Sequence, residues 1–412
     1  MTHLTSPSAR QDRPLSGLRV LECSSFVAGP SGCLTLGMLG ADVVKVDPLG
    51  GPADINRWPL SERTGQSLFW SSLNRGKRSV AVDLRSEEGR EIVMALATLP
   101  GPDGGLVVDN LVGRPWLTHE ALTARRADAI QVHIQGYNDG RPAVDYTVNA
   151  EIGVPQMTGP AGSADPVNHV VPAWDLLTGM TAVTGLLAAL RKRDRTGEGT
   201  YVSLALADVA LAGVASMGWL AEAVEQGDRP RHGNHLFGAF GTDFATCDGH
   251  RVMVVALTVR QWRNLVSVTG TERVFTALEE AAEVDLSLET DRFRMRETIA
   301  AVMRPWFAAR TVDQVTQELD DAHVLWSRYR PMTETVALLA ADPERSVVTD
   351  VEQPGIGTMT SARLPLRLDD AWTDPRPAPR FGQDTDQVLS ELLGLSDAEL
   401  GRLHDRGLVA GS

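Results

Sequence analysis

Short apolar segments alternate with helix-like segments through the first 140 residues, and this alternation constrains the fold more than any other feature of the chain. The segment between the first two apolar stretches, residues 33–40, has the composition of a helix. Residues 86–99 form a second helix-like segment, with Ser86 at the N-cap position and acidic residues in the first turn. The apolar strand-like segments are residues 18–23, 41–48, 77–84, 104–110 and 127–137. Strands and helices spaced in this way predict parallel βαβ units in an open α/β sheet, where ligands bind at the carboxyl ends of the strands.

The length of 412 residues predicts two domains. Residues 1–14 read as a loose tail, and residues 202–225 as one long buried helix. From residue 226 the composition changes, so we expect a second, smaller domain over residues 226–338. The last forty residues predict two short helices, divided by Gly394 and Ser396.

Composition excludes several classes of protein. The net charge of −14 argues against nonspecific binding to nucleic acid or to anionic membranes, both of which need a basic face. The three cysteines are odd in number and contain no C-x-x-C pair, so neither a disulfide framework nor a zinc site is expected. The polar N-terminus lacks the apolar core of a signal peptide, and no apolar run approaches the ~20 residues of a membrane helix. These features predict a cytoplasmic protein.

Two stretches could meet an anionic ligand. Residues 24–32 follow a strand and open a helix, so their free N–H groups could bind a phosphate. The fingerprint G-x-G-x-x-G is absent, because only Gly29 and Gly32 occur there, and a plain tight turn is the simpler interpretation. The second stretch, residues 74–85, is rich in basic residues and could be a phosphate-binding patch or an ordinary solvated basic loop. Its basic residues are Arg75, Lys77, Arg78 and Arg85.

A glycine-rich stretch contains His232 and His235, but it lacks the third ligand that a metal site needs. It is either a loop that covers a site or a purely structural loop. Motifs of serine hydrolases and P-loop enzymes are missing. Asp145 and Glu151 are the nearest approach to a carboxylate pair, and their spacing alone implies no geometry.

Asp175 precedes an apolar helix, which gives it two possible roles. It could be the N-cap of that helix, although Thr178 occupies the place where a capping box needs Glu or Gln. It could also be a nucleophile, because a helix dipole favours an ionised carboxylate and an ionised carboxylate can attack a thioester. The pattern leaves both roles open.

Several stretches, taken in order, resemble the family III CoA-transferases, which include formyl-CoA transferase and α-methylacyl-CoA racemase. They include LGMLGADVVKVDPLGG, NRGKRSVAVDL, WDLLTGMTAVTGLLAALRKRDRTGEGTY and APRFGQDTDQVLSELLGLS, and the similarity runs from about Leu15 to Val409. The resemblance implies a large Rossmann-like domain built from residues 1–225 and 339–412, a smaller α+β domain and an interlocked homodimer. It also implies that Asp175 is the nucleophile, that an acyl-CoA is the substrate, and that neither a metal nor a further cofactor takes part.

The same resemblance implies a set of binding residues. Val27, Ala28 and Gly29 would face the thioester end of CoA, with Gly136 nearby. The nucleotide end would contact Val82, Arg85, Asn110 and Leu111, and the substrate loop would contain Gly233, Asn234 and Gly238.

Departures from the family narrow the expected activity. Val144 occupies the position of the racemases' catalytic His, so racemisation loses a base. Val27 replaces a Gln of the formyl-CoA transferases, and Asp47 with Pro48 replaces their Glu-Arg pair, which argues against formate or oxalate as substrate. The resemblance favours movement of CoA between the two carboxyl groups of mesaconate. The alternatives are transfer between two small organic acids and a non-catalytic acyl-CoA-binding protein, whereas the missing glycine fingerprint disfavours a nicotinamide-dependent dehydrogenase.

Overall fold

The structure is a computed structural model that describes residues 13–111, 113 and 115–411, so nearly all of the loose tail expected for residues 1–14 lies outside the described part. The chain divides into two compact units. The large unit contains Met1–Ile152, His169–Ala221 and Leu339–Ser412. The small unit contains Gly153–Asn168 and Glu222–Leu338. Residues 339–412 therefore belong with the N-terminal part of the chain.

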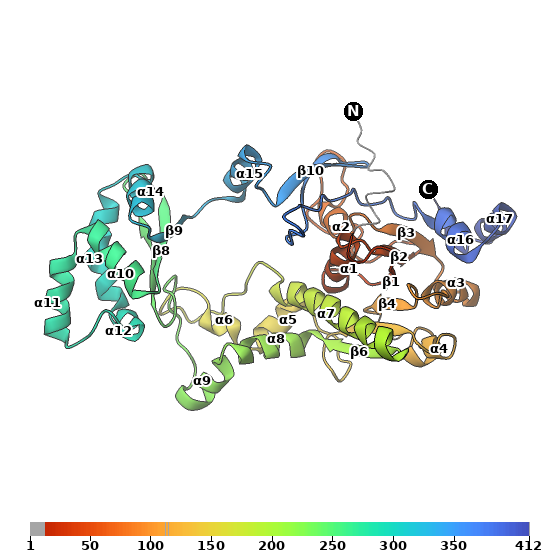
Figure 1. The fold of residues 1–412 in the computed structure, drawn as a ribbon, viewed down its shortest axis with the longest axis horizontal. Helices are drawn as coiled ribbons and strands as arrows, with labels where there is room; N and C mark the ends of the chain where they lie inside the picture. The colour runs from red at the N-terminus through yellow and green to blue at the C-terminus, as the bar shows by residue number, and fades with distance from the viewer. Residues whose placement is uncertain (1–12, 112, 114, 412) are drawn as a thin grey trace. The chain divides into compact units, whose positions relative to one another are not determined.

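A seven-stranded sheet forms the centre of the large unit, in the order β12-β3-β2-β1-β4-β5-β6. Figure 1 labels β1, β2, β3, β4 and β6 of this sheet. Neighbouring strands are parallel except for β12, where Val409 pairs antiparallel with Val82 of β3. The order 3-2-1-4-5-6 is that of the Rossmann fold, and its direction of winding reverses between β1 and β4. The prediction of an open, mostly parallel sheet is confirmed. The strands are β1 Arg19–Cys23, β2 Asp42–Pro48, β3 Arg78–Val82, β4 Leu106–Asp109, β5 Ile130–Gln135, β6 Thr200–Ala205 and β12 Val409–Ala410.

Alternate residues of each strand enter two different cores, which explains why the strands are apolar almost throughout. Leu21 of β1 and Val44 of β2 pack on one face with helices α3, α16 and α17. Val20 and Val43, the preceding residues, pack on the opposite face with α1 and α7. The helices are α1 Ala28–Met38, α3 Glu87–Ala97, α7 Ala173–Thr196, α16 Thr385–Leu393 and α17 Asp397–Asp405.

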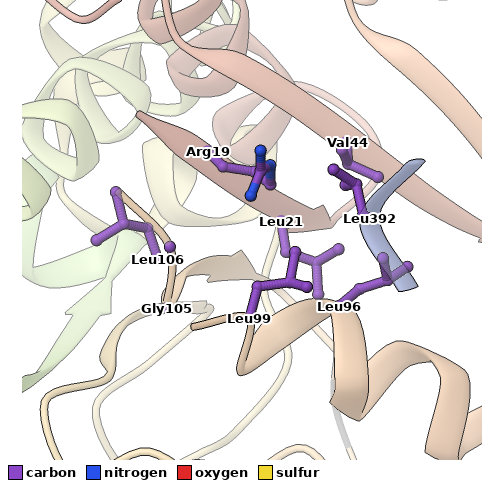
Figure 2. Close-up of a pocket in the computed structure, with 9 residues that line it drawn as sticks. Arg19, Leu21, Val44, Leu96, Leu99, Gly105, Leu106 and Leu392 are labelled. Atoms are coloured by element: carbon purple, nitrogen blue, oxygen red, sulfur yellow. The ribbon is translucent and has the colours of Figure 1, made fainter. Parts of the chain in front are cut away.

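The core under α3 and α16 contains one small cavity, shown in Figure 2. Leu21, Val44, Leu96, Leu99 and Leu392 contribute to its wall. Its volume of about 10 Å³ is near the minimum for a single water molecule. It is a packing gap and has no room for an acyl group.

Helix α7 packs against α1 at two glycines. A side chain at Gly32 of α1 would place its Cβ 2.8 Å from the carbonyl oxygen of Gly179 on α7, so the absence of a Cβ allows this close approach. By length and composition alone α7 could cross a membrane, as could the bent pair α8 (Leu206–Ser216) and α9 (Trp219–Gln226), contrary to the expectation that no segment approaches that length. In the large unit α7 lies against α1, β5 and β6.

The prediction of one helix over residues 202–225 is wrong, because the segment starts as a strand and its helical part is broken in the middle. Val202 belongs to β6 and pairs with Val132 of β5, and two shorter helices follow, α8 Leu206–Ser216 and α9 Trp219–Gln226. They separate at Gly218, whose φ of 76° no continuing helix can contain. The N-cap predicted at Ser86 is confirmed, because the Gly89 N–H donates to Ser86 Oγ at 3.0 Å. Ser396, predicted only to divide the last two helices, forms a capping box with Glu399.

The remaining elements of the large unit are shorter, and α15 straddles the boundary between the units. They are α2 Leu68–Leu73, α4 His119–Thr123, α5 Asp145–Glu151, α15 Met332–Ala341 and the antiparallel pair β10 Val348–Gln353 and β11 Gly357–Ala362.

The small unit is an antiparallel sheet, in the order β7-β8-β9, that packs with helices around its own apolar core. Residues 153–168, predicted to belong to the large domain, lie in this unit instead. Their position follows from hydrogen bonds to residues 231–233: Arg231 donates to the side chain of Gln156 and to the carbonyl of Ser163, and the Gly233 N–H donates to the carbonyl of Gly159. The elements are α6 Val154–Met157, β7 Phe240–Ala245, β8 Arg251–Ala256, α10 Val259–Thr269, α11 Glu272–Ala282, α12 Glu289–Arg294, α13 Arg296–Ala308, α14 Val312–Asp321 and β9 Leu325–Arg328.

Candidate active site

A cavity of about 620 Å³ lies within the large unit, next to the carboxyl ends of β1, β4 and β5. These strands flank the point where the winding of the sheet reverses, which is where α/β sheets bind their ligands. Among the residues singled out in the sequence, Val27, Ala28, Asn110, Gly136 and Asp175 line this cavity. The volume is in the range of small-molecule sites.

Asp175 is the third residue of α7, which begins at Ala173 after Pro172. Its side chain forms no capping hydrogen bond, so the interpretation of Asp175 as the N-cap is wrong. Among the described residues no group donates a hydrogen bond to this carboxylate, and Asp175 lines the cavity. The carboxylate is therefore free to meet a ligand.

Asp145, from the start of α5, performs the capping that Asp175 does not. Its Oδ2 accepts from the backbone N–H groups of Trp174 at 2.7 Å and Asp175 at 3.0 Å. Its Oδ1 lies 2.7 Å from Nε2 of His169, and the residue is 1% exposed. The sequence suggested a pair of Asp145 with Glu151, but Glu151 accepts from the hydroxyl of Tyr137. The carboxylate pair of the site is Asp145 with Asp175, thirty positions apart, and no local spacing reveals it.

The environment raises the pKa of Asp175 from 3.8 to about 7. Burial is the largest cause, the negative charge of Asp145 adds to it, and the positive charge of Arg57 opposes it. The expectation that this carboxylate is held ionised is wrong, because burial and the nearby charge of Asp145, which caps the first amides of α7, raise its pKa. Near neutral pH, Asp175 is therefore poised between its protonated and ionised forms.

The turn between β1 and α1 is held by side chains from elsewhere in the large unit. Asn110 clamps Ser25 through two hydrogen bonds, accepting from its N–H at 3.2 Å and donating to its carbonyl at 2.9 Å. The Phe26 N–H donates to Oδ2 of Asp54 at 2.8 Å. Phe26 has φ +68°, a left-handed conformation that is unfavourable for a bulky residue and persists only when the surroundings impose it. The turn predicted at 24–32 is short, since α1 already begins at Ala28.

Four residues predicted to contact CoA lie outside the wall of this cavity. Gly29 sits inside α1, where a Cβ would come 2.2 Å from Oγ of Ser24. Val82 is buried at the end of β3, and Arg85 is exposed beside Asp83. Leu111 lines a separate cavity of about 490 Å³. Their roles toward CoA stay predictions.

The basic stretch is mostly structural, so both interpretations offered for it, a solvated loop and a phosphate patch, are wrong for three of its four cations. Arg75 donates to the carbonyls of Ser72 and Ala362, each at 2.8 Å. Lys77 is buried and lies 2.7 Å from Oε2 of Glu22. Arg78 forms ion pairs with Asp42 and Glu391. Arg85 alone of the four is largely exposed, with 88% of its side chain accessible.

The glycine loop belongs to the small unit. Gly233 and Gly238 adopt φ of 60° and 80°, and Asn234 donates to Asp243 at 3.0 Å. The two histidines have different partners: His232 stacks on Phe237, and His235 lies 3.2 Å from Glu297. Across the residues that the structure describes, no group of three or more His, Cys, Asp or Glu could hold a metal. The role of Gly233, Asn234 and Gly238 as a substrate loop stays a prediction.

Val144 and Asp47, two positions at which this chain departs from related enzymes, have different surroundings. Val144, at the racemases' histidine position, is exposed and lines the Asp175 cavity. Asp47 is buried, 3.2 Å from Lys45, and burial raises its pKa to about 6. A histidine at position 144 would face the cavity, whereas Asp47 lies in the interior beside Lys45.

Known proteins resemble this chain in both sequence and fold. The sequence profile of CoA-transferase family III matches residues 15–385. The chain belongs to CoA-transferase family III. Within the family, 2-methylfumaryl-CoA isomerase of Chloroflexus aurantiacus is 48% identical over 406 residues, covering 96% of this chain and 98% of that protein. Succinyl-CoA:mesaconate CoA-transferase of Haloarcula hispanica is 30% identical, covering 92% of this chain and 96% of that protein. A CAIB/BAIF family protein from Brucella suis has the same fold, with a TM-score of 0.74, 26% identity and coverage of 93% of this chain and all of that one.

Proposed function

We propose that this family III enzyme converts 2-methylfumaryl-CoA into 3-methylfumaryl-CoA by moving CoA between the two carboxyl groups of mesaconate. One observation carries the proposal: a partly desolvated carboxylate, Asp175, lines the main cavity at the sheet's switch point and has no hydrogen-bond donor among the described residues. The 48% identity to an isomerase of this substrate supports the choice of acid.

In the proposed reaction Asp175 is the nucleophile of the first step and carries the acyl group in the later ones. A carboxylate oxygen of Asp175 attacks the C1 thioester carbonyl; the C–S bond breaks, leaving a mixed anhydride and CoA thiolate. The thiolate attacks the aspartyl carbonyl of the anhydride; the aspartyl C–O bond breaks, giving an aspartyl-CoA thioester and free mesaconate. The C4 carboxylate then attacks that thioester and releases the thiolate, which attacks the C4 carbonyl and restores the Asp175 carboxylate.

Retention of the diacid between the half-reactions makes the transfer intramolecular. Oriented partners that stay together reach effective molarities of ~10⁵ M or more, so a bound mesaconate would outcompete acids from solution. The glycine loop with Gly233, Asn234 and Gly238 is the segment to which we assign this retention, on the family resemblance.

The remaining assignments also rest on the family resemblance. CoA contacts Val27, Ala28 and Gly29 at its thioester end, and Val82, Arg85, Asn110 and Leu111 at its nucleotide end; Gly136 also belongs to the CoA-binding set. CoA is part of the substrate, and the reaction as written needs no metal or further cofactor. The enzyme is an interlocked homodimer on the same ground, and its cytoplasmic location is proposed from its composition.

Isotope labelling tests the proposal and separates it from its alternatives. The enzyme is incubated with unlabelled 2-methylfumaryl-CoA and an excess of ¹³C-labelled free mesaconate, and the C4 thioester is analysed by mass spectrometry. Unlabelled product is the expected result. Labelled product would instead show intermolecular transfer, the reaction named for the Haloarcula relative. No product at all, with CoA ester still bound, would indicate a binding protein.

A further inference from the structure

The charges that line the Asp175 cavity are unbalanced. Asp145 and Asp175 supply two carboxylates, and Arg57 is the one cation among the described residues of the wall. Asp145 is already bonded to His169 and to two backbone amides of α7. An entering diacid would therefore meet the carboxylate of Asp175, and in the described part of the wall Arg57 alone carries an opposing charge.

Two aromatic rings of the cavity wall hold the guanidinium of Arg57. Its Cζ lies 5.6 Å from the ring centroid of Phe26 and 5.3 Å from that of Phe69, distances at which a cation is attracted to a ring face. Phe26 is itself fixed by its hydrogen bond to Asp54 and by its left-handed backbone. The strained turn thus has a consequence in the site, because it keeps an aromatic ring beside Arg57.

The rings hold the guanidinium of Arg57 in place but leave its hydrogen-bond donors free. The backbone of Arg57 bonds to Asp54 and Ser67, whereas its side chain makes no hydrogen bond or ion pair with any residue in the described part of the chain. It is close enough to Asp175 to oppose the rise in the pKa of that carboxyl. Arg57, an exposed residue, therefore combines a place in the same cavity wall as Asp175 with free hydrogen-bond donors.

We propose that Arg57 binds the substrate carboxylate that is not bonded to CoA and so makes the site specific for dicarboxylic acyl-CoA esters. Guanidinium groups bind carboxylates through two parallel hydrogen bonds, which fixes both position and orientation. The group would hold the C4 carboxylate while C1 reacts and the C1 carboxylate while C4 reacts. This inference rests on the proposed function, because it assigns the second carboxylate of that reaction.

The test compares two esters that differ at that one group. In tiglyl-CoA a methyl replaces the free carboxylate of 2-methylfumaryl-CoA, so both esters present the same thioester to Asp175. Transfer of CoA onto the enzyme is followed by intact-protein mass after rapid quenching, and formation of 3-methylfumaryl-CoA is followed separately. The variants are Arg57→Gln, Arg57→Lys and the control Arg191→Gln, which removes one exposed charge on α7. Residue 191 is 16 positions beyond Asp175, about 24 Å along the helix.

The measurements are made near pH 9, about two units above the pKa of about 7, so that Asp175 is ionised in every variant. Loss of Arg57 also removes a charge that favours ionised Asp175, and that effect would reduce the rates with both esters equally. The ratio of the two rates therefore isolates recognition of the carboxylate.

Arg57→Gln is expected to slow CoA transfer from 2-methylfumaryl-CoA by about 100-fold, as for loss of hydrogen bonds to a charged group, and transfer from tiglyl-CoA by less than about threefold. Arg57→Lys should recover part of the discrimination, and Arg191→Gln should match the wild type. Equal losses with the two esters, or no loss with 2-methylfumaryl-CoA, overturn the inference. If the wild type discriminates between the two esters through Arg57 but forms no 3-methylfumaryl-CoA, only the proposed function is overturned. A wild type that takes up CoA from neither ester overturns both.

Discussion

Replacement of Asp175 by Asn should abolish turnover and, at alkaline pH, make the protein more stable. The pKa of Asp175 is about 7 in the folded protein and ordinarily 3.8, so folding favours the protonated carboxyl. As pH rises from about 4 to about 7, the unfolded chain loses this proton first, and the free energy of unfolding falls. At pH 8 and above, the difference between the two pKa values corresponds to a loss of about 4 kcal/mol in the free energy of unfolding. This value is an upper bound, and solvent in the open cavity reduces it to roughly 1–2 kcal/mol.

The assay is urea unfolding of wild type and Asp175→Asn at pH 5.5, 7 and 8.5, with turnover measured on the same preparations. Asn has nearly the same shape and carries no charge to desolvate, so the stability advantage of the variant should grow with pH. Because an amide is a poor nucleophile, turnover should fall by about three orders of magnitude or more. Intact mass must exclude deamidation of the introduced amide back to a carboxylate.

Asp145→Asn is the matched control, with the same chemical change on the neighbouring carboxylate. Asp145 accepts from two amides of α7 and pairs with His169, so its variant should lose about 1–3 kcal/mol. The two substitutions thus have opposite signs above pH 7. An Asp175→Asn protein that is less stable than wild type at pH 8.5, or whose advantage does not change with pH, would refute the desolvation argument. Near-normal isomerisation by that protein would refute the nucleophile assignment.

Other substitutions test the remaining contacts of the large unit. Asp145→Asn should shift the rise of kcat/KM with pH to lower pH, since the charge of Asp145 contributes to the raised pKa of Asp175; an unchanged profile would contradict this coupling. Gly32→Ala should destabilise the large unit by about 1–3 kcal/mol in thermal or urea unfolding, because its Cβ would lie 2.8 Å from a carbonyl oxygen of α7. Gly401→Ala, inside α17 with no atom within 4 Å of the new Cβ, should stabilise by about 0.5–1 kcal/mol, and similar losses in both variants would argue against the helix contact. Val144→His should place an imidazole in the cavity wall without producing α-proton exchange in a 2-methylacyl-CoA followed by NMR, because racemisation also needs an acid on the opposite face of the substrate; measurable exchange would contradict this.

Local patterns in the sequence were sufficient for the first five strands of the large unit and for the helix that begins after Ser86, but not for β6 or for the break between α8 and α9. The apolar segments became strands because alternate residues, such as Val20 and Leu21, enter different cores, and the helix starts at Ser86 and Ser396 follow from short-range capping chemistry. Family resemblance singled out Asp175. These features depend on neighbours a few positions away, or on motifs whose order survives in the chain.

The tertiary structure decided the environment of Asp175, because that environment is built from segments with no fixed spacing in the sequence. The order of the strands brings the turn after β1 beside Asn110 after β4, and it creates the cavity at that point. Asp145 takes over the cap of α7 from thirty positions away, which leaves Asp175 free. Burial, together with the charge of Asp145, raises the pKa of Asp175 instead of lowering it. Arg57 lies more than a hundred positions before Asp175 and in a segment without any motif, so no local pattern indicated a role for it. A charge acts through distance and local dielectric, and both are set only when the sheet has assembled.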